Sequence, residues 1–310
     1  MPTCSMPLST PVFVPVEHPS PAPSGVGDRR WASGTPRPQR SRFALRAAIA
    51  VIMFLAVVAL LAPIIAPYSP STQLDIVALK SRAPSLAHPF GTDRYSRDIL
   101  SRVIFGARVS LSVAGLAVLL AATVGTTYGV ISGYIGGRLD MLLMRLLDAF
   151  LSIPRVLLLV AVLSLWSPVP LGTLIVIIGL TSWFEVSRLV RIEVLSVRQR
   201  DFITAARALG TSDLRIIVRH VLPNVLAPIL VAAALGVGNV IILEAGLSYL
   251  GIGAREPTAS WGSIFFDGSG AFEDTWWVAL FPGLAILVTV LAFNALGDAL
   301  RELLDPHQLP

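Results

Sequence analysis

The chain has 310 residues, of which 54% are hydrophobic and only 14% are charged, and its formal net charge is +5. Roughly a quarter of the residues in an ordinary soluble domain are charged, so this composition excludes such a domain and indicates apolar surface that faces a lipid bilayer. All but one of the 24 basic residues are arginines, the exception being Lys80, and many flank apolar runs, which favours a role in membrane orientation over nucleic-acid binding.

The N-terminal residues 1–43 are rich in Pro, Ser and Thr and lack the short apolar core of a secretory signal. We expect them to form a retained, disordered tail, and the arginines in it favour a cytoplasmic position. The one cysteine, Cys4, lies here, which excludes an intrachain disulfide and a cysteine-based metal cluster. A first transmembrane helix is predicted at 44–66, followed by an extracytoplasmic loop at 67–106.

Residues 107–300 contain five further apolar stretches of about the 20 residues that a helix needs to cross the hydrocarbon. These predicted spans are Val109–Gly137, Leu142–Leu165, Leu171–Val190, Val225–Ala245 and Trp276–Leu296. In the first of them Gly125, Gly129 and Gly133 lie four residues apart, a spacing that lets another helix approach closely. The predicted fold class is therefore an all-α integral membrane protein with six transmembrane helices, whose C-terminal tail, 301–310, returns to the cytoplasm.

The distribution of charge between the spans sets the orientation. The loop 188–224 carries seven arginines against three acids, whereas the stretch from Gly251 to Thr275 carries Arg255 against four acids, so the first is predicted to be cytoplasmic and the second external. The first external loop disagrees with this rule because four arginines precede the second span. They are Arg94, Arg97, Arg102 and Arg108.

Within loop 188–224, the segment Asp201–Asn224 predicts two short amphipathic helices joined at Gly210. Gly210 suits the left-handed cap of the first helix, Thr211 or Ser212 can cap the second, and Pro223 is expected to end it. Such a hairpin can lie in the lipid headgroup layer or can dock a cytoplasmic partner, and its helical pattern leaves both uses open.

The hairpin resembles the "EAA" signature of permeases in bacterial ABC importers. That signature reads Glu-Ala-Ala, three residues, Gly, nine residues, Ile, one residue, Leu-Pro. Thr204, Ala205 and Ala206, then Gly210, then Leu222 and Pro223 match its spacing, and the chain departs from it at Thr204 and His220. Three other segments resemble the dipeptide, oligopeptide and nickel permeases of this family. They are HPFGTD at His88–Asp93 with the residues after it, EAGLSYLGIG at Glu244–Gly253, and Ala279–Pro306.

The resemblance implies the type I ABC importer permease fold, in a bacterial cytoplasmic membrane, with a coupling helix in a cytoplasmic loop. It also implies three kinds of partner: a homologous permease subunit, two cytoplasmic ABC ATPase subunits and an extracytoplasmic solute-binding protein. The residues that it assigns to ATPase coupling are Thr204, Ala205, Ala206, Arg207, Leu209, Gly210, Leu222 and Pro223. ATP and Mg²⁺ would bind to the partner subunits, and no cofactor or metal is expected in this chain.

The chain has no catalytic equipment of its own. A phosphate-binding loop needs a lysine after glycine, and Lys80 follows Leu79. Polar residues inside the spans usually face protein or a watery cavity. We therefore single out Arg155, Asn239 and Glu244 as candidates for the translocation path, although structural polar contacts would also explain them.

The predicted function is a permease half of an ATP-driven importer for di- or oligopeptides. A permease for nickel or another small solute remains open, because those permeases have similar sequences. From other classes, the chain could be a membrane anchor that recruits cytoplasmic partners without transport, or a stand-alone channel.

Overall fold

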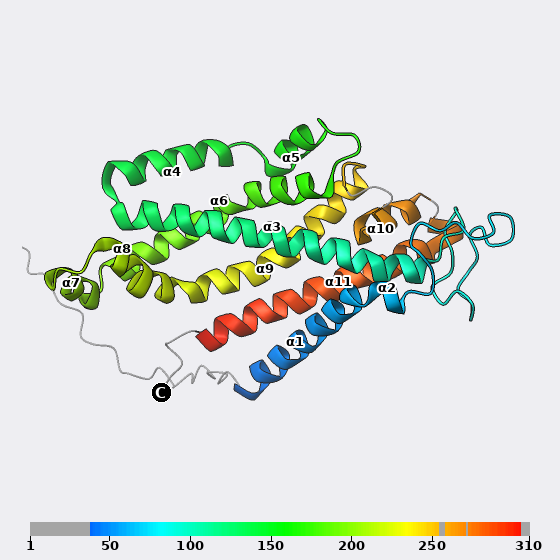
Figure 1. Cartoon of the computed structure of the whole chain (residues 1–310), viewed down its shortest axis with the longest axis horizontal. Helices are drawn as coiled ribbons and strands as arrows, with labels where there is room; N and C mark the ends of the chain where they lie inside the picture. Colours follow the sequence, from blue (N-terminus) through cyan, green and yellow to red (C-terminus); the bar gives the residue numbers. More distant parts are fainter. Residues whose placement is uncertain (1–37, 254–257, 271, 305–310) are drawn as a thin grey trace, which may run out of the picture. The chain divides into compact units, whose positions relative to one another are not determined.

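The computed structural model describes residues 38–253, 258–270 and 272–304, and the side chains of 38–42 and 272 are left aside. The tail predicted at 1–43 thus lies mostly outside the described residues. Every secondary-structure element longer than an isolated bridge in the described ranges is a helix (Figure 1). The longest are α1 (Pro38–Leu60), α3 (Ile99–Ile135), α6 (Leu171–Arg198), α9 (Leu222–Tyr249) and α11 (Phe272–Leu304).

Five of the described helical stretches are long and apolar enough to cross a membrane, and a bent pair of shorter helices brings the number to six if it counts as one span. The all-α class and the number of spans are therefore as predicted. The outward surfaces of these helices are apolar, as a lipid environment requires, for example at Phe54 of α1, Leu119 of α3 and Leu291 of α11, each more than half exposed.

The bent pair replaces the single helix predicted from Leu142 to Leu165. Here α4 (Gly137–Leu151) and α5 (Arg155–Leu163) meet at 74°. Pro154 causes the break, since it has no N–H to donate and favours an extended residue before it. Arg155 therefore begins a new helix instead of lying within a continuous one.

Two other boundaries differ from those expected. Helix α3 begins at Ile99, ten residues before Val109, because the Asp98 side chain caps it by accepting the Ser101 N–H. Pro223 does not end the hairpin's second helix, so that expectation was wrong: α8 (Asp213–Ile216), the π-helical turn η1 (Ile217–Val221) and α9 follow without a break. Pro223 lies in the first turn of α9, where a missing N–H is tolerated.

The interior is formed where α3, α5, α6 and α9 meet, with Ala117, Leu159, Ile178 and Val240 among its buried residues. Helix α1 packs against α11 and α3. Helix α3 runs between two ends of this bundle. The loop end contains residues 67–98 and α10 (Trp261–Ser269), and the hairpin end contains α7 (Asp201–Ala208) and α8 (Figure 1).

Candidate functional site

The hairpin turns at Gly210, as its sequence predicts. Gly210 has φ +76°, a left-handed conformation that favours glycine. Its N–H donates to the Arg207 carbonyl at 2.9 Å, and the Thr211 N–H donates to the Ala206 carbonyl at 3.1 Å. This pair of bonds is a Schellman cap. Ser212 occupies the N-cap position of α8 without a side-chain hydrogen bond.

One face of the hairpin is packed firmly against the spans. Ile203 of α7 and Ile216 of α8 are fully buried, and Ala206 packs beside them. They contact buried residues of α3, α6, η1 and α9, at Val130, Tyr134, Val190, Val194, Val197, Val221 and Val225. A well-packed apolar contact of this kind transmits displacement, because protein interiors are as dense as organic crystals.

Polar contacts hold the same face. The Tyr134 hydroxyl of α3 donates to an Asp213 carboxylate oxygen at 2.6 Å, and the Arg207 guanidinium lies 5.2 Å from the centre of the Tyr134 ring. The pKa of Arg207 is raised above its usual value, chiefly by hydrogen bonding with Tyr134. Tyr134 thus joins α7 and α8 to α3, a role that sequence reasoning missed because the partners lie 73 and 79 positions away.

The opposite face of the hairpin is exposed and mixes apolar with charged side chains. Leu209 is 86% exposed and Leu214 is 73% exposed. Gly210 lies between them in open space, because a side-chain carbon added there would have no neighbouring atom within 4 Å. Of the predicted coupling residues, Thr204, Ala205, Arg207, Leu209, Gly210 and Pro223 are exposed, and Ala206 and Leu222 are partly buried. The hairpin therefore combines a packed back with an open front on which Leu209 and Leu214 are exposed.

A cavity of about 240 Å³ lies inside the bundle between α3, α5, α6 and α9. It brings together Arg155 and Asn239, two of the three residues singled out for a translocation path. One Arg155 terminal nitrogen donates to the Ser182 hydroxyl at 2.5 Å, and Glu185 lines the same cavity. Small-molecule sites usually enclose 300–1,000 Å³, so this cavity is too small to be a complete site by itself.

Glu244, the third of those residues, does not line this cavity. One of its carboxylate oxygens accepts hydrogen bonds from the Ser248 and Ser260 hydroxyls, each at 2.7 Å, and the side chain is buried. Ser260 is the N-cap of α10, with a complete capping box formed with Ser263. Glu244 therefore ties α9 to the start of α10 at the loop end.

The loop end also holds a cluster of charges that sequence reasoning did not connect. Arg97 and Arg102 bind the Asp93 carboxylate at 2.6 and 2.7 Å, and both reach Asp267 of α10. The one signal in the sequence was the disagreement of this arginine-rich loop with the charge rule. In the structure these two arginines are paired with Asp93 and Asp267, so they add little net charge at this end of the bundle.

Comparison with known proteins agrees with this architecture. Residues 125–309 match the family described as binding-protein-dependent transport system inner membrane component. The dipeptide transport system permease protein DppC of Alkalihalophilus pseudofirmus is 39% identical, covering 89% of this chain and 90% of that protein. The glutathione transport system permease protein GsiD of Escherichia coli is 41% identical over 89% of this chain and 90% of its own length. The oligopeptide transport system permease protein OppC of Haemophilus influenzae is 36% identical, with coverages of 86% and 87%.

Among solved structures, an inward-facing conformation of the MetNI methionine ABC transporter matches with a TM-score of 0.53 at 18% identity, covering 67% of this chain and 98% of that chain. At that identity the likeness supports the fold, which is that of a type I ABC importer permease. With its apolar spans and its near-full-length relatives, the chain is a multi-pass, non-catalytic permease subunit that belongs to the family of binding-protein-dependent transport system inner membrane components.

Proposed function

We propose that this chain forms half of the transmembrane pathway of an ATP-driven importer for di- or oligopeptides in a bacterial cytoplasmic membrane. The names of its relatives support a peptide substrate, since dipeptide, oligopeptide and glutathione permeases each match most of the chain. Nickel or another small solute is the second candidate. A non-transporting anchor or a stand-alone channel is disfavoured, because these relatives are transport-system subunits over nearly their whole length.

One observation carries the proposal: the hairpin has a packed back, a front with exposed leucines and a continuous helical link to the cavity. From Asp213 the helical path runs through η1 and α9 to Asn239 beside the cavity, about 39 Å at 1.5 Å per residue. A cytoplasmic ATPase that grips Leu209 and Leu214 would therefore move a wall of the cavity. ATP and Mg²⁺ would bind to two such ATPase subunits, and ATP hydrolysis would drive the motion of the cavity wall.

The remaining partners are those that the family implies. A homologous permease subunit would supply the other wall of the pathway, which explains why the cavity of this subunit alone is small. An extracytoplasmic solute-binding protein would deliver the peptide to the loop end. The hairpin, together with both chain termini, would then lie in the cytoplasm.

Reconstitution tests this function. The chain is co-expressed with a homologous permease subunit and candidate ABC ATPases, and the complex is placed in liposomes with the binding protein added to one side. We expect ATP-dependent uptake of a labelled dipeptide or tripeptide, with no uptake when ATP is omitted. Uptake of nickel but not peptide would favour the second candidate, and stable purification without any ATPase would favour the anchor.

Orientation is tested separately by labelling. In a Cys4→Ser background without the ATPase subunits, a Leu209→Cys variant is expected to react with a membrane-impermeant maleimide in inverted vesicles but not in intact cells, because Leu209 is 86% exposed at the hairpin end, which we place in the cytoplasm. A Val77→Cys variant in the residue 67–98 loop, where Val77 is 94% exposed, should show the opposite pattern. Labelling of Leu209→Cys from outside the cell would contradict the proposed contact between the hairpin and a cytoplasmic ATPase.

Removing the Tyr134 hydroxyl is expected to weaken coupling without unfolding the chain. In Tyr134→Phe the ring remains under Arg207, but the hydroxyl's bonds to Asp213 and Arg207 are lost, and a hydrogen bond to a charged group contributes about 1.5–3 kcal/mol. Peptide transported per ATP hydrolysed should fall severalfold. Tyr128→Phe, on the same helix, is the matched control, because it removes a hydroxyl that donates to the Leu143 carbonyl of α4, away from the hairpin. Equal coupling ratios in the two variants would count against this role of Tyr134.

Replacing Arg155 tests the cavity as part of the path. Arg155→Gln removes the cation that lines it and donates to Ser182, so we expect uptake to fall while complex assembly persists. Arg145→Gln is the control, since Arg145 is exposed on α4 of the same broken span. Initial rates of peptide uptake, normalised to purified complex, compare the two, and indistinguishable rates would remove Arg155 from the path.

A further inference from the structure

The charge cluster at the loop end is built around the Asp93 carboxylate, each of whose two oxygens accepts two hydrogen bonds. One Asp93 oxygen accepts the backbone N–H groups of Tyr95 and Arg97 at 2.8 and 2.9 Å. The other accepts the Arg97 and Arg102 guanidinium groups at 2.6 and 2.7 Å. With four donors on its two oxygens and 1% exposure, Asp93 is a fixed anchor that holds two cations close together.

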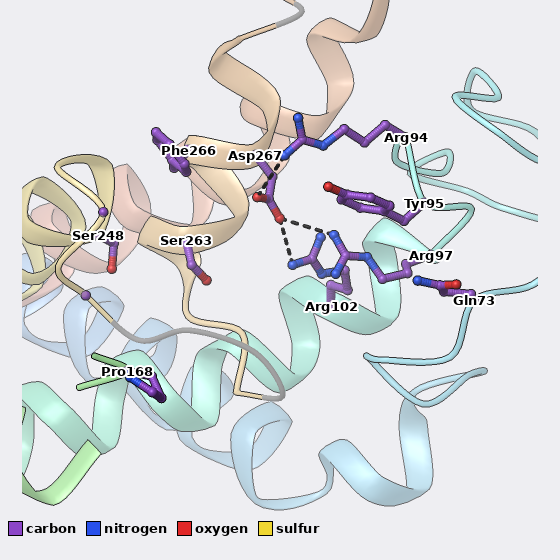
Figure 2. Close-up of a pocket in the computed structure, with 12 residues that line it drawn as sticks. Gln73, Arg94, Tyr95, Arg97, Arg102, Pro168, Ser248, Ser263, Phe266 and Asp267 are labelled. Atoms are coloured by element: carbon purple, nitrogen blue, oxygen red, sulfur yellow. Dashed lines mark hydrogen bonds and ion pairs between the residues drawn. The ribbon is translucent and has the colours of Figure 1, made fainter. Parts of the chain in front are cut away.

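Asp267 completes this cluster from a different helix. One of its oxygens accepts from Arg102 at 3.0 Å and from Arg97 at 3.3 Å, and the other lies 3.8 Å from Arg94. Figure 2 shows the Asp267 carboxylate between Arg94 on one side and the Arg97 and Arg102 pair on the other. The side chain of Asp267 is 19% exposed, against 3% and 1% for Arg97 and Arg102. Asp267 is thus the more accessible of the two described carboxylates that bind this buried pair of guanidinium groups.

These residues line a cavity of about 430 Å³, within the 300–1,000 Å³ range of small-molecule sites. Its walls come from four parts of the chain: the residue 67–98 loop, α3, the turn at Pro168 and α10 with the end of α9 (Figure 2). The rings of Tyr95 and Phe266 are partly exposed there, and the Ser263 hydroxyl adds a polar contact. Among the residues that the structure describes, Arg94, Arg97, Arg102, Asp93 and Asp267 together give the lining and its anchor one net positive charge.

We propose that this cavity is a subsite for the C-terminal carboxylate of a peptide, and that Asp267 occupies the carboxylate position when no peptide is there. The inference rests on the proposed function, since it requires a peptide substrate and an external loop end. Two guanidinium groups that share one carboxylate already have the geometry that a second carboxylate needs. The peptide exchanges with Asp267 on Arg97 and Arg102, while Asp93 keeps both cations in place.

A small ligand fits this site better than an acidic side chain of a docking protein. Arg97 and Arg102 are almost completely buried behind Asp267, so a partner's surface residue would meet Arg94 first, whose side chain is 54% exposed. Competition with Asp267 also keeps binding weak, as a transport intermediate requires, because each bond to the peptide replaces one already made within the protein.

The test compares a peptide that has a free C-terminal carboxylate with its C-terminal amide, in the reconstituted complex with its binding protein. The measured quantity is the ratio of acid to amide uptake in each variant, divided by the same ratio in the wild type. Because the binding protein is identical in every assay, its own preference cancels. The variants are Asp267→Asn and Arg94→Gln, with Lys80→Gln as the control, since it removes a cation from an exposed position of the same loop outside the cavity.

Asp267→Asn removes the competing anion, and the acid-to-amide ratio is expected to rise about threefold or more. Arg94→Gln removes an exposed cation of the cavity, and the ratio should fall about two- to fivefold, as for a surface ion pair. Lys80→Gln should leave the ratio at its wild-type value.

Equal changes in acid and amide uptake in both cavity variants would overturn the inference and would assign the cluster to loop structure or to docking of the binding protein. If Asp267→Asn does not assemble, the comparison of Arg94→Gln with Lys80→Gln decides alone. Failure of the proposed function looks different, because the wild-type complex would then take up neither peptide.

Discussion

Gly210→Asp is expected to abolish ATP-driven uptake while the chain still inserts and folds. Gly210 is exposed at the tip of the hairpin, and a side-chain carbon added there meets no atom of this chain within 4 Å. The substitution therefore places a charged side chain on the face between Leu209 and Leu214 that we assign to the ATPase. Burying an unpaired carboxylate in an apolar contact is unfavourable by several kcal/mol, enough to prevent docking.

Gly137→Asp is the matched control for Gly210→Asp. Gly137 also has positive φ, +61°, is exposed at the hairpin end, and leaves open space for a side chain. Both variants carry the same backbone strain and the same added charge, so a difference between them reports on the hairpin surface. Co-purification of the ATPase and peptide uptake are measured for both. Wild-type uptake by Gly210→Asp would refute the docking role. Ala206→Asp, expected to have the same effect, is a less clean test because Ala206 also packs against the spans.

Gly129→Leu is expected to prevent stable folding of the spans. A side-chain carbon at Gly129 would lie 2.6 Å from the Ser187 carbonyl oxygen and 2.8 Å from Val190, both on α6. Gly125 and Gly133 meet α6 at similarly short distances, so α3 and α6 cannot separate locally to make room. Overpacking typically costs 1–3 kcal/mol, and we expect about 3 kcal/mol or more here because the obstacle is backbone.

The control is Gly115→Leu on the same helix. Gly115 has no atom within 4 Å of its added side-chain carbon, so the same substitution should be tolerated on that exposed face. The yield of monodisperse protein in detergent and its thermal midpoint compare the two variants. A thermal midpoint of Gly129→Leu equal to that of Gly115→Leu would contradict the close packing of α3 on α6.

The sequence by itself determined the features that depend on local pattern. Long apolar stretches predict spans because backbone in lipid must satisfy its own hydrogen bonds, and the structure has helices at each predicted place. Gly210 was identified as a helix cap because its left-handed conformation is costly for other residues. The spacing of Gly125, Gly129 and Gly133 predicted a close helix contact, and α6 confirms it.

Only the tertiary structure decided where the polar residues of the spans and loops lie. Arg155 and Asn239 share a cavity, whereas Glu244 binds serines near α10, and nothing in the sequence around them distinguishes these cases. Arg102 is buried and binds Asp267, which lies 165 positions later in the chain. The sequence around Arg102 does not show that this distant partner exists. The energy of a buried charge depends on its partners, and those are set by how distant segments pack.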